Sequence, residues 1–418
     1  MRGFLLLLLL NITIYCRAAY LFIPMDETQT DHLKAYGIAY WILTEDVSLD
    51  WMLNYRGGSF MVKHLQAFQN ECIIRGVSYE VISDAEANSI LNTMASPSSN
   101  MDVMKLEKFP KIAVYSPKSK QPWDDAVTLV LTYAEIPYDV IFDDEIMENK
   151  LPKYDWLHLH HEDFTGQYGK FYRAYQHYAW YQEQQREYEA SARKHGFNKV
   201  SQLKLATVKK IKAYVASGGF LFAMCSATDT YDIALAGEGV DMIESIYDGD
   251  PADQQAQSKL DFSKTIAFEN FIIERDEMRY EYSNIDNQAN TRGLREENDY
   301  FTLFKFSAKW DPIPTMLTQN HQEIIHGFMG QTTGFKNELV KGEVVVMGQT
   351  PSIQEAKYIH GVLGKGFWTF YGGHDPEDYQ HFVNEPPTDL NLHPNSPGYR
   401  LILNNILFPA AKKKKQKT

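Results

Sequence analysis

The sequence predicts an α/β protein built on a doubly wound, mostly parallel sheet, with an N-terminal α/β segment and a large insertion. Apolar runs alternate with helical patterns along most of the chain, as in repeated strand–helix units. One run, Phe220–Met224, is apolar throughout, as expected for a strand covered on both faces. The alternation breaks between 245 and 340 and then resumes, which indicates that two distant segments complete one sheet.

The composition is typical of a globular protein and excludes some partners. The chain has 418 residues, enough for one elaborated domain or two packed lobes, with 44% hydrophobic residues and a formal net charge of -13. A nucleic-acid partner is not expected, because phosphate binding requires clustered lysine and arginine. The one basic run, Lys412–Lys415, lies in a tail at 411–418 and is most simply solvated.

The N-terminus has the pattern of a secretory signal peptide. Arg2 precedes an apolar run too short for a comfortable membrane span, and small residues precede a cleavage point near residue 19. We therefore expect 1–19 to be a signal peptide, the mature protein to be periplasmic or extracellular, and no transmembrane segment to remain. Only Cys72 and Cys225 are then left, so no disulfide framework is expected.

Residues 20–105 are predicted to form the N-terminal α/β segment. Apolar runs at 39–43 and 79–82 are typical of strands, and they flank an amphipathic helix near 60–75. A loop at 95–100, with a proline among serines, separates this segment from the rest.

The main α/β domain is predicted over 106–245 and 340–410, with 246–339 as an insertion or cap. The expected strands lie at 111–115, 138–142, 154–160, 220–224, 342–347 and 366–371, and the expected helices at 125–135, 170–193, 203–215 and 399–407. In the second of these helices Phe171, Tyr175, Tyr178 and Tyr181 recur at turn spacing. Such a stripe can stack against sugar rings, but it is more typical of a buried helix face.

Cys225 ends the uniformly apolar strand and precedes a helix that Thr228 or Asp229 can cap. The carboxyl end of a central strand lies in the crevice where open α/β sheets bind ligands. The helix N-terminus lowers a thiol pKa and supplies backbone donors for an oxyanion. A buried structural cysteine fits the same position, so position alone leaves both interpretations open.

His374 follows the last apolar strand and two glycines, which let the backbone turn sharply. A neutral imidazole there can accept the proton of Cys225, and Glu377 or Asp375 can orient the ring. Alternatively, these acids only order the loop through hydrogen bonds.

The densest cluster of titratable groups covers 158–163. On a strand His158 and His160 share one face about 6.6 Å apart, so they can hold a metal with Glu162 or Asp163. No second ligand set at a characteristic spacing appears elsewhere, which favours a polar substrate pocket over a metal site. No metal or cofactor is therefore expected, and the candidate substrate-binding residues are His158, His160, His161, Glu162 and Asp229.

Two motifs carry a family resemblance: Gly218-Gly-Phe-Leu-Phe-Ala-Met-Cys225-Ser-Ala-Thr-Asp-Thr230 and Gly366-Phe-Trp-Thr-Phe-Tyr-Gly-Gly-His374-Asp-Pro-Glu377. In this order they resemble the trehalose-utilisation branch of the class I glutamine amidotransferase-like superfamily. The resemblance covers about 110–245 and 340–410, and it implies a flavodoxin-like sheet with its site at the elbow.

The chain departs from the family pattern in two ways. The trehalose-utilisation branch usually has histidine where Cys225 stands, so this position looks closer to the cysteine-dependent amidotransferases. Those enzymes have glycines two residues either side of the cysteine, where Ala223 and Ala227 stand here. They also place their acid two residues after the histidine rather than at Glu377.

The whole chain is also similar to bacterial proteins labelled asparagine synthetase B, but its motifs do not support that activity. Such a synthetase needs a processed N-terminal cysteine and a pyrophosphate loop resembling Ser-Gly-Gly-x-Asp-Ser. Here the N-terminus resembles a signal peptide, and the run from Ser217 lacks the acid and the second serine of that loop.

The leading hypothesis is an exported Cys/His hydrolase that acts on an amide or related acyl bond of a small molecule. Hydrolysis is favoured over transfer, because no synthase domain that would accept ammonia is visible. The alternative is a carbohydrate-binding or carbohydrate-processing protein in which the thiol is incidental. A non-catalytic envelope component is a third hypothesis.

Overall fold

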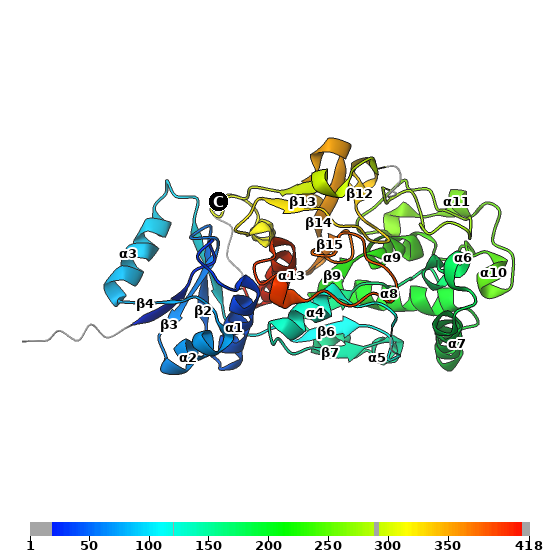
Figure 1. Cartoon of the computed structure of the whole chain (residues 1–418). Helices are drawn as coiled ribbons and strands as arrows, with labels where there is room; N and C mark the ends of the chain where they lie inside the picture. The colour runs from blue at the N-terminus through cyan, green and yellow to red at the C-terminus, as the bar shows by residue number, and fades with distance from the viewer. Residues whose placement is uncertain (1–18, 120, 288–291, 412–418) are drawn as a thin grey trace, which may run out of the picture.

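The computed structural model of the protein describes residues 19–119, 121–287 and 292–411 as an α/β fold with two sheets (Figure 1). The expected signal peptide therefore lies outside the described residues except for Ala19, and the basic tail does so except for Ala411. No helix in the described ranges is long and apolar enough to cross a membrane.

The N-terminal segment forms an antiparallel sheet A. Its strand order is β4 (Glu80–Ile82), β1 (Tyr20–Ile23), β3 (Ser59–Lys63), β2 (Leu49–Leu53) and β5 (Asp102–Leu106). Helices α2 (Gln66–Arg75) and α3 (Asp84–Ala95) belong to the same segment. The predicted strand at 79–82 and the loop after 95 are confirmed, whereas the predicted helix near 60–75 begins only at Gln66 because β3 precedes it.

The predicted strand at 39–43 is wrong, because these residues lie inside helix α1 (His32–Thr44). α1 contacts α2 and β2 of the N-terminal segment as well as α4 (Ala126–Tyr133) and α13 (Pro397–Leu407) of the main domain. It is therefore buried on almost every side, and a short stretch of such a helix has the same apolar pattern as a buried strand. One apolar core joins α1 to both sheets.

One half of sheet B is parallel. Its strand order is β7 (Asp139–Ile141), β6 (Ile112–Tyr115), β8 (Trp156–Leu159), β9 (Phe220–Met224) and β15 (Gly366–Tyr371). Each neighbouring pair runs parallel, and Phe367 of β15 lies opposite Phe220 of β9. Two segments far apart in the sequence thus complete one sheet, as predicted.

Helices cover both faces of this parallel half. Alternate residues of β9 enter different cores: Phe220, Phe222 and Met224 pack with α1, α4 and α13, and Leu221 and Ala223 pack with α8 (Val200–Ser217) and α9 (Ser226–Ala236). The other helices of this region are α5 (Asp143–Met147), α6 (Tyr172–Tyr175) and α7 (Ala179–Lys194). Burial on both faces explains why β9 is apolar throughout.

The other half of sheet B is antiparallel, so the sheet is mixed rather than mostly parallel. Beyond β15 the order continues with β14 (Glu355–Leu363), β13 (Val345–Thr350), β10 (Tyr300–Leu303) and β11 (Ile324–His326), and β12 (Phe335–Lys336) pairs with β14. Three of these strands come from 246–339, which also holds α10 (Ser245–Asp248) in part and α11 (Ala256–Lys259). The segment expected to be a cap therefore contributes strands to the sheet, and these strands, of two to four residues, are too short to stand out in the sequence.

Candidate active site

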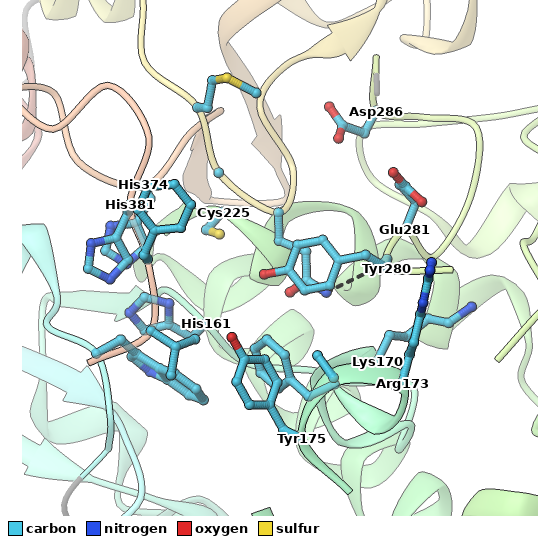
Figure 2. Close-up of a pocket in the computed structure, with 18 of the residues that line it drawn as sticks. His161, Lys170, Arg173, Tyr175, Cys225, Tyr280, Glu281, Asp286, His374 and His381 are labelled. Carbon is cyan, nitrogen blue, oxygen red and sulfur yellow. Dashed lines mark hydrogen bonds between the residues drawn. The ribbon is translucent and has the colours of Figure 1, made fainter. Parts of the chain in front are cut away.

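A cavity of about 650 Å³ lies at the carboxyl ends of the parallel strands. Figure 2 shows His161, His374 and His381 on one side of it and Lys170, Arg173 and Glu281 on the other, with Cys225 and Tyr280 between them. Its size and its mixture of aromatic and polar walls are typical of small-molecule sites.

The cavity lies where the strand order of the parallel half reverses. The chain leaves β6 toward Asp124 and Asp125, and leaves the neighbouring strand β8 toward His160 and His161. Successive connections leave such a pair of strands toward opposite faces, which opens a crevice at their carboxyl ends. The side chains that follow the two strands therefore meet beside the cavity.

Cys225 adopts a strained backbone at the turn from β9 into α9, with φ of 51° and ψ of -141°. A non-glycine residue reaches such angles only when its surroundings fix it. Its own N–H donates to Gly373 O at 3.2 Å, and the Ala227 N–H donates to His160 O at 3.0 Å. Cys225 is itself the N-cap residue of α9, so the expected capping by Thr228 or Asp229 is wrong, because both lie inside the helix.

Cys225 lines the cavity but is almost fully buried, and backbone N–H groups surround its sulfur. Burial raises the pKa of this thiol above its ordinary value, although hydrogen bonds from the backbone N–H groups of Gln331, Thr332 and Ser226 act to lower it. The thiol therefore holds its proton at neutral pH, and chemistry at the sulfur requires a base.

His374 is 4% exposed and lies in a group of histidines. Its ring stacks on His381 with centroids 3.9 Å apart and lies 4.7 Å from His160 and 4.6 Å from His161. Neither ring nitrogen has a hydrogen-bond partner among the described residues, so no hydrogen bond joins His374 to Cys225. Burial, followed by the neighbouring His161 and His160, holds the pKa of His374 well below its usual value and keeps the ring neutral.

Gly373 and Gly330 allow the close approach of the backbone at His374. Gly373 has φ of 92°, and a Cβ there would lie 2.5 Å from the Phe328 ring. A Cβ on Gly330 would lie 2.8 Å from the His374 backbone nitrogen. The sharp turn that the two glycines before His374 predict is therefore present.

The oxygen that joins His158 and His160 belongs to Asp125. Its Oδ2 lies 3.1 Å from His158 Nε2 and 3.3 Å from His160 Nδ1, and Glu162 and Asp163 do not take this place. Burial raises the pKa of Asp125, but the two imidazoles outweigh it and hold the pKa well below its ordinary value. Neither His158 nor His160 lines the cavity, whereas His161 does.

The other three predicted site residues do not line the cavity. Glu162 lies 3.8 Å from the buried Lys204 ammonium, and burial raises its pKa to about 7. Asp229 accepts a hydrogen bond from the Thr332 hydroxyl at 2.9 Å, and burial raises its pKa to about 7.

Glu377, the third of these residues, pairs with His393 at 3.0 Å. The expected orienting role of Glu377 is therefore not supported, because its carboxylate contacts a different histidine.

The sequence did not indicate His381, Asp124 or the loop 327–334, which all border the site. The only signal for the loop is its three glycines in Gly327-Phe-Met-Gly-Gln-Thr-Thr-Gly334. Its position is fixed by Lys357, which donates to the carbonyls of Phe328 and Thr333, and by Asp286, which accepts the N–H groups of Thr333 and Gly334.

The aromatic stripe of 170–193 is divided between two roles. Phe171 and Tyr175 line the cavity, Tyr181 is buried in a satellite core, and Tyr178 is 51% exposed. With Trp123 and Tyr280, the first two give the cavity an aromatic wall.

Comparisons with known protein families and with curated proteins give no match. Among solved structures, two proteins of Salmonella typhimurium named as cytoplasmic proteins match with 11% identity and a TM-score of 0.34, over 72% of this chain and 100% of theirs. A beta-galactosidase from Bacillus circulans sp. alkalophilus matches with 11% identity and a TM-score of 0.25, over 65% of this chain and 29% of its own. Likenesses this weak establish neither a family nor an activity.

Proposed function

We propose that the protein is an exported hydrolase of an amide or related acyl bond in a small molecule, with Cys225 as the nucleophile. The observation that carries this proposal is the strained elbow of Cys225, which holds a thiol at the wall of a cavity with three backbone donors around the sulfur. Backbone strain of this kind is retained at functional sites, whereas a cysteine that only fills the core does not require it.

In this proposal His374 is the base, because it follows the strand that pairs with β9 and its buried imidazole is neutral. The sulfur attacks the carbonyl carbon while its proton passes to the His374 ring, and the ring then returns the proton to the leaving amine or alcohol. The resulting thioester is hydrolysed by water, which releases the acid and restores the thiol.

We further infer that the parallel half of sheet B is flavodoxin-like and related to the class I glutamine amidotransferase-like superfamily. Numbered along the chain, its strands β6, β7, β8, β9 and β15 lie in the spatial order 2-1-3-4-5, as in flavodoxin-like folds. The positions of Cys225 and His374 at two neighbouring strand ends support the same inference.

The test uses a panel of chromogenic amides and esters with the Cys225→Ala variant. Cys72→Ala is the matched control, because Cys72 is also buried but lies on α2, in the N-terminal segment. We expect Cys225→Ala to lose at least about a hundredfold of any activity found, and Cys72→Ala to keep it. Full activity in a Cys225→Ala protein with an unchanged melting temperature would contradict the proposal.

The identity of the base is tested by comparing His374→Gln with His161→Gln, since both side chains line the cavity. A loss of kcat confined to His374→Gln supports the assignment, and a loss confined to His161→Gln moves the role to that ring. Trapping of a thioester by mass spectrometry in either slow variant would identify the acyl-enzyme directly.

A second candidate function is carbohydrate binding, favoured by the aromatic wall of Trp123, Phe171, Tyr175 and Tyr280. Sugar rings stack on such faces while polar groups bind their hydroxyls. Glycan binding that survives Cys225→Ala but is lost in Trp123→Ala would favour this candidate over the hydrolase.

A further inference from the structure

Four histidine rings beside the cavity form two stacked pairs that lie against each other. His160 stacks on His161 with centroids 3.9 Å apart and planes 8° apart, and His374 stacks on His381 at 3.9 Å and 12°. His374 approaches both members of the first pair within 4.7 Å. Such crowding places many imidazole nitrogens in one small volume.

In three of the four rings, one nitrogen lies near an oxygen, which orients the ring. The contacts are His160 Nδ1 to Asp125 Oδ2 at 3.3 Å, His161 Nε2 to Asp124 O at 2.7 Å, and His381 Nδ1 to Glu385 Oε1 at 2.6 Å. The other nitrogen is left available in His160 and His161, whereas His381 Nε2 lies 3.5 Å from Asp124 Oδ1. A carboxylate or carbonyl behind an imidazole is the usual arrangement behind metal-ligating histidines.

Neither ring nitrogen of His374 has a hydrogen-bond partner among the described residues, although the side chain is almost fully buried. The Nε2 of His160, which is 1% exposed, also has none. Buried polar groups are nearly always paired, so unpaired ones that converge on one point indicate a ligand there.

We propose that His160, His161 and His374 bind a divalent transition-metal ion of the zinc class. One ring nitrogen from each residue lies within 4.8 Å of the others. Tetrahedral zinc holds its nitrogen ligands about 3.4 Å apart, so modest ring rotations close the site. His161 and His374 also line the cavity, which leaves the fourth position of the ion open to a water molecule or a substrate.

The sequence favoured a pocket over a metal site because no second ligand set appeared at a characteristic spacing. In the fold the further ligand comes from β15. His374 follows the carboxyl end of that strand and lies beside His160 and His161, which follow β8. Neutral imidazoles bind Zn²⁺, Co²⁺, Ni²⁺ and Cu²⁺, so this ligand set selects that group of ions over Mg²⁺ or Ca²⁺.

This inference does not rest on the proposed hydrolase. An ion bound to His374 occupies the imidazole that would otherwise accept the Cys225 proton, so the two uses of His374 compete. A metal bound at this site is therefore expected to suppress thiol chemistry.

The test measures metal binding by the chelator-treated protein, with the expected signal peptide at 1–19 left out. Zn²⁺ is titrated by calorimetry and Co²⁺ by its visible absorption, which reports coordination geometry independently of any activity. We expect one ion per chain in the wild type, and a loss of affinity of at least about a hundredfold in His374→Gln and His161→Gln. His374→Gln removes no protein hydrogen bond of the ring, so it should fold.

His393→Gln is the control, because that ring pairs with Glu377 and lies outside the proposed site. It should bind as the wild type does, and so should Cys225→Ala, which separates this proposal from the hydrolase. Asp125→Asn should weaken binding by about 10- to 100-fold. Equal binding by the wild type and a folded His374→Gln protein, or no binding by either, would overturn the proposal.

Discussion

The backbone N–H of Cys225 donates to the carbonyl oxygen of Gly373 at 3.2 Å. This bond joins the residue that follows β9 to the residue before His374, just beyond the end of β15, and the two strands pair in parallel. The parallel pairing of β9 and β15 therefore brings Cys225 and His374 to the same edge of the sheet, and the turns that follow the two strands place their side chains. Site residues held in this way tolerate little backbone movement.

We expect Gly330→Ala to damage the site. Its Cβ would lie 2.8 Å from the His374 backbone nitrogen and 2.9 Å from the Gly373 carbonyl carbon, and backbone atoms cannot rotate aside. Overpacking of this kind costs about 1–3 kcal/mol, measurable by urea unfolding, and should be accompanied by loss of metal binding or activity. Gly342→Ala meets no atom within 4 Å and should change stability by less than about 0.5 kcal/mol. Equal effects of the two changes would contradict the argument.

The reactivity of Cys225 should reveal its raised pKa. In a Cys72→Ser background, iodoacetamide should modify Cys225 at pH 7 more slowly than it modifies a free cysteine peptide, and the rate should keep rising above pH 8.5, because burial raises the pKa of this thiol. The rate is followed by mass spectrometry, with the Cys225→Ala variant as the blank. A fast rate that is already constant at pH 7 would mean that the thiolate is the resting form.

Asp229→Asn should change the dependence of stability on pH below neutrality. Burial raises the pKa of Asp229 to about 7 in the folded state, from 3.8 when unfolded. The folded protein therefore binds more protons between these values, and the stability that protonated Asp229 provides is lost as pH rises from about 4 to 7.

Asparagine keeps the acceptor for Thr332 and has no proton to lose. The variant should therefore gain stability relative to wild type across this range, by on the order of 1 kcal/mol per pH unit at most, in urea unfolding at several pH values. A stability difference that does not vary with pH would contradict the assigned pKa.

Lys357→Met tests the support of the loop 327–334. Burial lowers the pKa of Lys357 to about 7 from 10.5, so the unfolded chain binds more protons between these values and wild-type stability should rise with pH from 7 to 9. The variant should lose this rise and, because two carbonyls lose a donor, be less stable by about 1–3 kcal/mol at pH 9.

Lys341→Met is the matched control for this prediction. The Lys341 ammonium also donates to two backbone carbonyls, those of Phe262 and Thr265, but on a different segment. If only the Lys357 variant changes the reactivity of the Cys225 thiol or loses metal binding, the contacts of Lys357 with the loop 327–334 hold the site in place. Equal losses in both variants would show a general effect of destabilisation.

Elements with a strong local pattern could be predicted from the sequence. β6, β9, β15 and α8 fall within a few residues of their expected positions, because alternation, apolar runs and a terminal glycine act over short distances. α1 was mistaken for a strand because contacts on nearly all of its sides remove the polar face that identifies a helix. β10 and β11 were not predicted, because strands of four and three residues are too short to show a period, and the strands they pair with come from other segments.

The sequence by itself determined that Cys225 follows a buried strand and that His374 follows another, because strand ends and glycine turns depend on residues that are neighbours in the sequence. Only the tertiary structure decided which groups surround them. Asp125, His381 and the loop 327–334 reach the site through contacts between distant segments, and no local pattern encodes such contacts. For the same reason, Glu377 stands close to His374 in the sequence but pairs with His393.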